Sequence, residues 1–419
     1  MGRGAPDIGS QHLQFLDDGV VPANEALSRS LNVPAVRMLQ NFGLDRFYHY
    51  LKQLKLKDLK FNANHYGLSL VLGGAESNLW DLCKSYAAMA STLNHFSDNS
   101  SQYFTNEFVQ PIYQSNVRAN FGTLIHEKPV FDAASIYLTF ESLKQVNRPE
   151  SDESWEIYNS SQDIAWKTGT SFGFRDAWAI GTTKDYVVGV WVGNADGEGR
   201  PGLTGVQTAA PILFDIFELL PKSEWFSKPY DEMLKVNICK KSGYRASSIC
   251  DDTQLKDIQR SGQKTEPCPY HKWVHLDTSE QFQVNSTCEI ISNIHHKPWF
   301  VLPPLQAYYF KNKNPFYKEL PPHREDCSDS NSTSMAFIYP NQQSTIFLPK
   351  DFNGNTNELI LKIAHTKPEL ELYWYIDNRY IGSTKDIHNM AVLPEEGEHL
   401  ITVVDELGNA LKHKITISE

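Results

Sequence analysis

Apolar residues follow helical spacing in several parts of the first half of the chain, where they recur three and four positions apart. This spacing predicts a helix over about Asn24–Asn41, closed by Gly43, and another over about Ser77–Leu93. A further helix is predicted over about Val206–Leu220. It ends before Pro221, because proline disfavours helical geometry in the residue that precedes it.

Between the last two of these helices, β-branched and aromatic residues indicate strands. We expect strands over Gln162–Lys167, Ala177–Thr183 and Tyr186–Gly193. The turn Lys184-Asp185 is short enough to join the last two as an antiparallel hairpin. Helices combined with antiparallel strands indicate an α+β fold for this part of the chain.

The chain from Ser332 to Glu419 has a different pattern, in which short apolar segments recur at regular intervals between turn residues. The predicted strands are Met335–Tyr339, Thr345–Leu348, Leu359–Ala364, Leu370–Ile376, His399–Val404 and Lys412–Ile417. Short strands at regular spacing favour a small all-β sandwich of the immunoglobulin-like kind.

The stretch between these two regions carries many Pro, Lys and His residues and little periodicity. We therefore predict three parts: a domain over residues 1–222, a cysteine-containing connector over 223–330, and a β-sandwich domain over 331–419.

The chain has six cysteines, and Cys83 lies among apolar residues of a predicted helix, where a core position is expected. The other five are Cys239, Cys250, Cys268, Cys288 and Cys327. In an exported protein they are typical of one or two disulfides, with at least one thiol left free. The alternative is a metal site formed by Cys239, Cys250, Cys268 and His271. Its long first spacings are loose for zinc, so we favour disulfides.

The composition narrows the functional classes. Of the 419 residues, 41% are hydrophobic and 21% charged, as in a soluble globular protein long enough for two or three domains. The net charge of −11 argues against nucleic acid as a partner, because phosphate binding needs a concentrated basic face. The apolar runs are too short for a membrane span, and the N-terminus shows no secretory signal.

The segment Lys167-Thr168-Gly169-Thr170 carries the first chemical motif. A Lys-Thr-Gly triplet at a strand end is one of three signatures of a class of serine acyl-transferases. The lysine supplies positive charge to a substrate cleft, and the glycine lets substrate backbone approach closely. The hydroxyl of Thr170 can hold a substrate carboxylate, and its N–H can point at a developing oxyanion. By itself the triplet also fits an exposed strand end followed by a turn.

A second motif, Ser30-Leu31-Asn32, precedes Pro34 in the first predicted helix. An S-x-N element places a hydroxyl and an amide together facing a cleft. The hydroxyl can pass a proton to a leaving amine, and the amide can bind a substrate carbonyl. By itself this motif also fits a Ser and an Asn near a helix break, and the Lys-Thr-Gly triplet favours the functional interpretation.

Several further segments accompany these motifs in the same order along the chain. They are 67–76 (GLSLVLGGAE), 85–90 (SYAAMA), 175–178 (RDAW), 189–194 (GVWVGN), 268–271 (CPYH), 372–377 (LYWYID) and 403–408 (VVDELG). Together with both motifs, the chain resembles the class A penicillin-binding proteins, and its C-terminal part resembles their 1C-type branch. The resemblance implies that residues 1–222 form the C-terminal part of a penicillin-binding transpeptidase domain.

The resemblance implies three catalytic residues. Ser30 would relay protons, and Asn32 would position the substrate amide. Lys167 would set the electrostatics of the cleft and support Ser30.

It also implies a substrate-binding set of Thr168, Gly169 and Thr170, in which Thr168 and Thr170 would hold the terminal carboxylate of a stem peptide or β-lactam. The N–H of Thr170 would supply half of an oxyanion hole. Arg175 and Asp176 are expected to form a structural ion pair that braces the strand end.

The family's nucleophile is the serine of an S-x-x-K motif that precedes the S-x-N element, and its lysine partner activates it. The one S-x-x-K match in this chain is Ser261-Gly262-Gln263-Lys264, which follows both other motifs and fits a chance match. We therefore expect a portion of a 1C-type protein that lacks the nucleophile segment and the family's glycosyltransferase domain.

The expected function is that of a peptidoglycan D,D-transpeptidase, an acyltransferase of cell-wall biosynthesis, with this chain alone inactive. Its ligands would be stem peptides and β-lactams, and its C-terminal domain could bind other cell-envelope proteins. We expect a periplasmic location, with the parent protein anchored by an upstream helix, and neither metal nor cofactor. The alternative is a non-catalytic cell-wall-binding or adaptor protein. A serine β-lactamase is disfavoured, since such enzymes are usually compact single domains.

Overall fold

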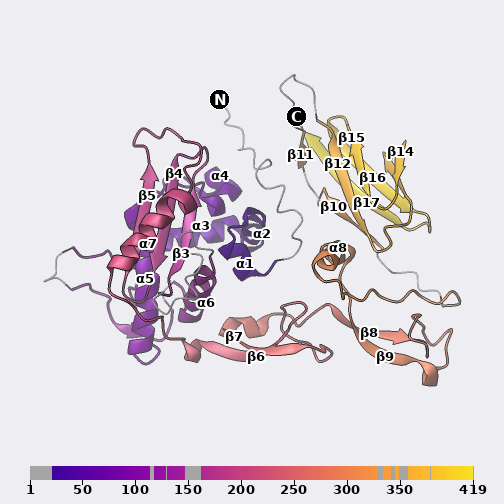
Figure 1. The fold of residues 1–419 in the computed structure, drawn as a ribbon, viewed down its shortest axis with the longest axis horizontal. Helices are drawn as coiled ribbons and strands as arrows, with labels where there is room; N and C mark the ends of the chain where they lie inside the picture. The colour runs from indigo at the N-terminus through magenta and orange to yellow at the C-terminus, as the bar shows by residue number, and fades with distance from the viewer. Residues whose placement is uncertain are drawn as a thin grey trace. The chain divides into compact units, whose positions relative to one another are not determined.

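The computed structural model describes residues 21–113, 118–128, 130–146, 162–327, 334–340, 345–348, 357–377 and 379–418. These residues form two compact units (Figure 1). The N-terminal unit comprises residues 21–237 and 255–265, and the C-terminal unit comprises residues 238–254 and the described residues from 266 onward.

The N-terminal unit is built around a three-stranded antiparallel sheet. Its strands are β3 (Ala165–Thr170), β4 (Asp176–Thr182) and β5 (Val187–Gly193), in the order β3-β4-β5. The register pairs Lys167 with Ile180 and Ile180 with Gly189, which confirms the predicted hairpin. Among the described strands, this order leaves β3 at an edge of the sheet, so the Lys-Thr-Gly triplet lies on an edge strand.

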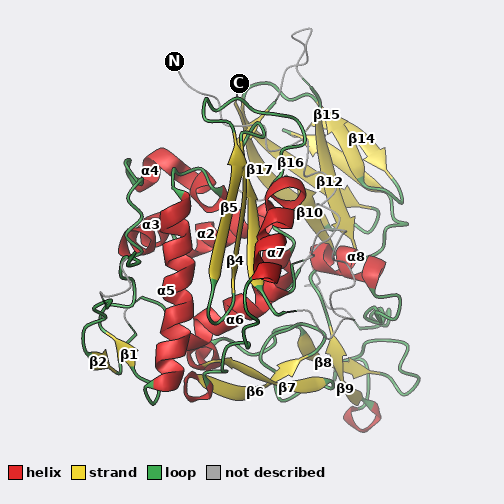
Figure 2. Ribbon diagram, turned by 60° about the vertical axis from the view of Figure 1, so that its left-hand side comes forward, coloured by secondary structure: helices red, strands yellow, loops and turns green. Residues whose placement is uncertain are grey.

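Helices cover both faces of this sheet, and Figure 2 shows α5 (Leu79–Asp98) and α7 (Ala210–Leu219) on opposite sides of it. Glycines mark where the helices approach most closely. A Cβ at Gly189 would lie 2.2 Å from Cys83 Sγ of α5, and one at Gly181 would lie 2.8 Å from Phe217 of α7. Trp166, which pairs with Gly181, therefore faces α7 and packs edge-on against Phe214.

The other elements of this unit are short. They are α1 (Ala23–Ser28), α2 (Asn32–Phe42), α3 (Leu44–Gln53), α4 (Ala63–Tyr66), η2 (Gly67–Leu72), β1 (Tyr103–Phe104), β2 (Leu124–Ile125), α6 (Ala133–Lys144), η4 (Gly205–Ala209), η5 (Tyr230–Glu232) and η6 (Arg260–Lys264). The prediction of one continuous helix over Asn24–Asn41 was wrong. The chain breaks it between Ser28 and Asn32, where Ser30 has a φ of 56°.

The C-terminal unit contains the predicted sandwich as two sheets. One has the order β10-β12-β15, with β10 (Met335–Tyr339), β12 (Leu359–His365) and β15 (Asn389–Val392). The other has the order β11-β17-β16-β13-β14, with β11 (Thr345–Phe347), β13 (Leu372–Ile376), β14 (Arg379–Thr384), β16 (Gly397–Asp405) and β17 (Ala410–Ser418). Their apolar faces enclose a core that includes the fully buried Trp374. The predicted strands are confirmed, and β14 and β15 are additional.

The connector has more regular structure than its sequence suggests. Strands β6 (Met233–Cys239) and β7 (Thr253–Gln259) pair with each other, as do β8 (His271–Leu276) and β9 (His295–Phe300). The turn η7 (Ile291–Asn293) and the helix α8 (Pro304–Lys313) complete it, and α8 packs on β10 and β12. Each sheet of the connector has only two strands. The sequence therefore lacks the repeated alternation of apolar and polar residues that predicts a larger sheet.

The structure also shows which cysteines are paired. Cys288 and Cys327 form a disulfide, whereas Cys83, Cys239, Cys250 and Cys268 are free thiols. Cys83 is half-buried on α5 against the backbone of Gly189. Within the described part of the chain, no helix is long and apolar enough to cross a membrane.

Candidate functional site

Ser30 occupies a tight turn between α1 and α2. Its N–H bonds to the Leu27 carbonyl at 3.1 Å, and the N–H of Leu31 bonds to the Ala26 carbonyl at 2.9 Å. Leu31 and Ala26 are buried and hold the turn in place. A positive φ is unfavourable for a residue with a Cβ, so the surrounding structure maintains strain at Ser30 while its side chain stays exposed.

Lys167 reaches this turn from β3. Its Nζ donates hydrogen bonds to Ser30 Oγ and to the Thr168 carbonyl, the latter at 3.0 Å. Burial lowers the pKa of Lys167, because a low-dielectric environment disfavours its charged form. A lysine with a lowered pKa that touches a serine hydroxyl can exchange a proton with it.

The alternation of β3 divides its other site residues between two faces. Gly169 lies on the same face as Lys167 and opposite Trp178 in the ladder. Thr168 and Thr170 point to the other face, where Thr170 Oγ1 accepts a hydrogen bond from the Gly205 N–H at 3.0 Å. Gly205 is packed so closely that a Cβ there would lie 2.7 Å from the Gly169 carbonyl oxygen.

The structure thus joins Ser30 and Lys167 directly and places Asn32 two residues further on, half-buried at the start of α2. Thr168 and Thr170 adjoin the η4 turn instead of Ser30. Gly205 is a further part of the site that neither sequence motif includes. The glycine that precedes the predicted helix over Val206–Leu220 was the available signal, but the contact to β3 depends on tertiary packing.

The expected ion pair between Arg175 and Asp176 is not present among the described residues. Asp176 Oδ1 instead accepts a hydrogen bond from Trp191 Nε1 at 2.9 Å, between β4 and β5. The Trp191 ring lies 6.4 Å from that of Trp178, measured between centroids. Asp176 therefore braces an aromatic pair on the Gly169 face of the sheet.

The S-x-x-K match falls in the short helix η6 (Arg260–Lys264) at the end of β7. Arg260 of this turn donates a hydrogen bond to the Asp231 carbonyl. This turn is part of the β6–β7 ribbon, whereas Ser30 and Lys167 belong to the α1–α2 turn and to β3.

The connector brings a second group of chemically active side chains together. Cys239, Cys250, Cys268 and His271 each offer one ligand atom, and these atoms all lie within 4.8 Å of one another. The described residues include no other cluster of this kind except the one around the Cys288–Cys327 disulfide.

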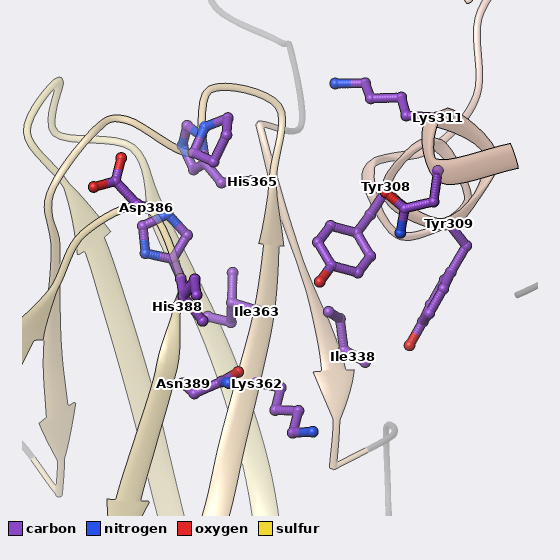
Figure 3. Close-up of a pocket in the computed structure, with 13 residues that line it drawn as sticks. Tyr308, Tyr309, Lys311, Ile338, Lys362, Ile363, His365, Asp386, His388 and Asn389 are labelled. Carbon is purple, nitrogen blue, oxygen red and sulfur yellow. The ribbon is translucent and has the colours of Figure 1, made fainter. Parts of the chain in front are cut away.

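A cavity of about 300 Å³ lies between α8 and the sandwich (Figure 3). Tyr308 projects from α8 toward the strands that carry Ile338 and Ile363, with His388 on the far side. Among the described residues, His388 Nε2 is a buried atom without a hydrogen-bond partner. Burial lowers the pKa of His388, and the neighbouring His365 adds to this effect.

Comparison with known proteins gives one family model and several similar proteins. The model of the Penicillin-Binding Protein C-terminus Family matches residues 324–417. Penicillin-binding protein 1C of Escherichia coli (strain K12) is 32% identical over 206 residues, which are 48% of this chain and 23% of that protein. Penicillin-binding protein 1A of Neisseria cinerea is 26% identical over 204 residues, which are 47% of this chain and 24% of that protein.

Among solved structures, penicillin-binding protein 1A of Haemophilus influenzae is similar over 58% of this chain and 41% of its own, with a TM-score of 0.42 and 18% identity. In both curated relatives, the match spans about a quarter of the relative's length.

Proposed function

The chain belongs with the class A penicillin-binding proteins, which it matches over part of their length, and from this premise we propose that it carries one side of a D,D-transpeptidase cleft. The substrates would be stem peptides that end in D-Ala-D-Ala, with β-lactams as competing ligands. The hydrogen bond between Lys167 and Ser30 carries this proposal, because it joins the S-x-N and Lys-Thr-Gly elements into one site.

The edge position of β3 supports the binding of an extended peptide. An edge strand has backbone N–H and C=O groups that no neighbouring strand uses, and a peptide can pair with them. Gly169 keeps the Lys167 face of this strand free of a bulky side chain. Thr168 and Thr170 would bind the terminal carboxylate, and the Thr170 N–H would stabilise an oxyanion.

Ser30 and Lys167 would together transfer the proton to the leaving amine. A half-buried lysine with a lowered pKa loses its proton more easily, and the Ser30 hydroxyl in contact with it can relay that proton. Asn32 at the start of α2 would hold the substrate amide in reach of this pair.

We propose that the chain by itself forms no acyl-enzyme, because its one S-x-x-K match lies in η6 and not before the S-x-N element. The glycosyltransferase activity and envelope location of such proteins are part of the same proposal. So is the division into a transpeptidase part (residues 1–222), a connector (223–330) and a C-terminal domain (331–419).

Binding and acylation are tested separately. Calorimetry with a D-Ala-D-Ala-terminated pentapeptide should show binding that Lys167→Met weakens at least about tenfold, equivalent to about 1.4 kcal/mol. Lys144→Met, which removes a lysine held by Glu141 and Asp163, is the matched control and should bind normally. Equal affinity of both variants and the unaltered chain would refute the proposed cleft.

Intact-mass measurement after incubation with a labelled penicillin tests the missing nucleophile. We expect no added mass on the folded chain. A stable adduct that maps to any serine, Ser261 included, would show that the chain does contain a nucleophile.

A second candidate is a non-catalytic adaptor that binds the cell wall through its C-terminal unit. The cavity beside α8 favours it, because Tyr308 and Tyr309 line it and offer aromatic rings on which a ligand can stack. Under this function, Tyr308→Ala with Tyr309→Ala abolishes co-sedimentation with purified peptidoglycan, and Lys167→Met leaves it unchanged. If the double tyrosine variant still co-sediments and Lys167→Met does not, the adaptor function is excluded.

A further inference from the structure

The four side chains of the connector cluster come from separate segments of the C-terminal unit. Cys239 ends β6, Cys250 precedes β7, and Cys268 and His271 lead into β8. The imidazole Nδ1 of His271 is 3.7 Å from the sulfur of Cys239, 3.4 Å from that of Cys250 and 3.5 Å from that of Cys268. Three sulfurs thus surround one nitrogen at nearly equal distances.

These separations match a tetrahedral metal site. Zinc binds thiolate sulfur at about 2.3 Å and imidazole nitrogen at about 2.0–2.1 Å. With tetrahedral angles, these bond lengths place sulfur and nitrogen about 3.5 Å apart. Each of the three observed separations lies close to this value, so a zinc ion fits among the four atoms.

The outer nitrogen of the same imidazole is held by a carboxylate. His271 Nε2 lies 3.1 Å from Asp251 Oδ1, and Lys241 Nζ holds this carboxylate with contacts of 3.0 and 2.8 Å. When the carboxylate accepts a hydrogen bond from Nε2–H, the proton stays on Nε2 and the Nδ1 lone pair is directed at the sulfurs. This carboxylate–histidine arrangement is typical of metal sites.

Hydrogen bonds to sulfur complete the surroundings. The backbone N–H of Ser247 lies 3.3 Å from Cys250 Sγ, and Ser242 Oγ lies 3.2 Å from Cys268 Sγ. After Cys239 the chain reverses at Gly243, which has a φ of 74°. The Ser247 N–H and the Ser242 hydroxyl stabilise the negative charge of thiolates, the form in which cysteine binds a metal.

Burial and ligand number indicate a structural role. Cys239, Cys268 and His271 are all at most 5% exposed, and Cys250 is half-buried. A disulfide would use only two of the three sulfurs. It would leave the third as a free thiol and would not account for the His271 Nδ1 that faces all three. Four protein ligands fill the coordination of zinc and leave no open position for a substrate.

We propose that Cys239, Cys250, Cys268 and His271 bind one Zn²⁺ ion in a closed tetrahedral site that holds the end of β6 to the start of β8. This differs from the disulfide that the sequence spacings favoured for these cysteines. The ion replaces the covalent links that a small connector with little apolar core otherwise needs.

The test is the metal content and thiol count of the full chain. The chain is purified without added chelator and analysed by inductively coupled plasma mass spectrometry, where we expect one zinc ion per chain. Denaturation without reductant should expose all four free thiols, including Cys83. A chain that has no zinc, takes up none from added Zn²⁺ and exposes only two thiols would overturn the proposal in favour of a disulfide.

Cobalt substitution identifies the ligands. Co²⁺ in the site should give thiolate-to-metal charge-transfer absorption and the intense visible bands of tetrahedral coordination. Cys268→Ser should lose the bound metal, whereas Cys83→Ser keeps it. Unchanged Co²⁺ spectra in Cys268→Ser would refute the assignment.

Asp251→Asn keeps all four ligands and so tests the site without removing them. The metal affinity, measured by competition with a chromogenic chelator, should fall by about 10–100-fold. Asp252→Asn, which alters the neighbouring carboxylate paired with Lys240, is the matched control and should keep its affinity. Equal affinities in the two variants would contradict the role of Asp251.

Discussion

Lys167 Nζ donates a hydrogen bond to Ser30 Oγ, although 137 positions separate the two residues in the sequence. The lysine is on an edge strand, and the serine is in a turn with a left-handed backbone. Neither element determines the position of the other, so this contact reports how the helices α1 and α2 dock beside the sheet.

Two substitutions of Ser30 distinguish the contribution of its hydroxyl to stability from the cost of its strained backbone. Ser30→Ala removes the hydrogen-bond acceptor and keeps the strain, whereas Ser30→Gly removes both. We expect Ser30→Gly to be about 1 kcal/mol more stable than Ser30→Ala, since glycine adopts a positive φ without steric cost. Hydrogen exchange of peptides from α1, α2 and β3 measures the difference. If the two variants are equally stable, the turn at Ser30 is not strained.

Gly205 and Gly169 form a matched pair for the packing beside β3. A Cβ at Gly205 would lie 2.5 Å from the Trp178 carbonyl oxygen, so Gly205→Ala should destabilise the N-terminal unit by about 1–3 kcal/mol. A Cβ at Gly169 would come no closer than 3.6 Å, so Gly169→Ala should change stability by less than about 0.5 kcal/mol.

The same pair distinguishes folding from binding. The methyl group of Gly169→Ala lies on the Lys167 face of β3 and should weaken pentapeptide binding without lowering stability. Chemical denaturation and calorimetry measure the two effects. A stable Gly169→Ala variant with undiminished binding would place the peptide elsewhere.

Lys84 and Asp81 form an ion pair inside the N-terminal unit, 3.2 Å apart and almost fully buried. Lys84→Met leaves the carboxylate without its partner and should lower stability by about 3–5 kcal/mol. The double variant Lys84→Met/Asp81→Asn removes both charges and should recover part of this loss. Urea unfolding measures each variant, and Lys144→Met, at a half-exposed lysine, should differ by less than about 1 kcal/mol. A small effect of Lys84→Met would show that water reaches Asp81.

Asp405 gives the sandwich a predictable dependence on acid. Burial alone would raise the pKa of Asp405, but hydrogen bonds from Asn409, His365 and the Leu407 N–H hold it below the usual 3.8. The folded state therefore binds this proton less tightly than the unfolded state. The resulting stability is present above about pH 4 and is lost as the pH falls through the lower, folded pKa.

Asp405→Asn should therefore destabilise the sandwich at neutral pH and flatten its decline below about pH 4. Urea unfolding at each pH, followed by pulse-labelling hydrogen exchange of β12 and β16 peptides at one fixed pH, measures this. The exposed Glu396→Gln is the control and should retain the original profile. An unaltered profile in Asp405→Asn would assign the acid sensitivity to other groups.

The Cys288–Cys327 disulfide closes a segment of 39 residues. Its loss in Cys288→Ser/Cys327→Ser should destabilise the C-terminal unit by up to about 4 kcal/mol, from the loop entropy it removes in the unfolded chain. Cys83→Ser is the control, and thermal unfolding with and without reductant is the measurement. If reductant affects the double variant as much as the unaltered chain, a second disulfide exists.

Local patterns were sufficient where one face of an element is buried. The alternation of apolar residues located β4, β5 and most strands of the sandwich, and the same alternation assigns Lys167 and Gly169 to one face of β3. It did not reveal β14 and β15. The first contains Gly382 and exposed Tyr380, and the second is short, so neither has a clear apolar face.

The helix break at Ser30 was missed for a related reason. The apolar spacing continues through Ser30 because Ala26, Leu31 and Leu39 are all buried, on either side of the turn. The buried residues of α1 and α2 together have the spacing expected of a single continuous helix.

The sequence by itself determined the order of the elements, the α+β and all-β character of the two regions, and the residue types available for chemistry. Only the tertiary structure decided that Lys167 meets Ser30, that Thr170 binds the Gly205 N–H, and that three cysteines gather around His271. Periodicity records which side of an element is buried and not what lies against it. Contacts between distant segments arise from packing, which no local spacing specifies.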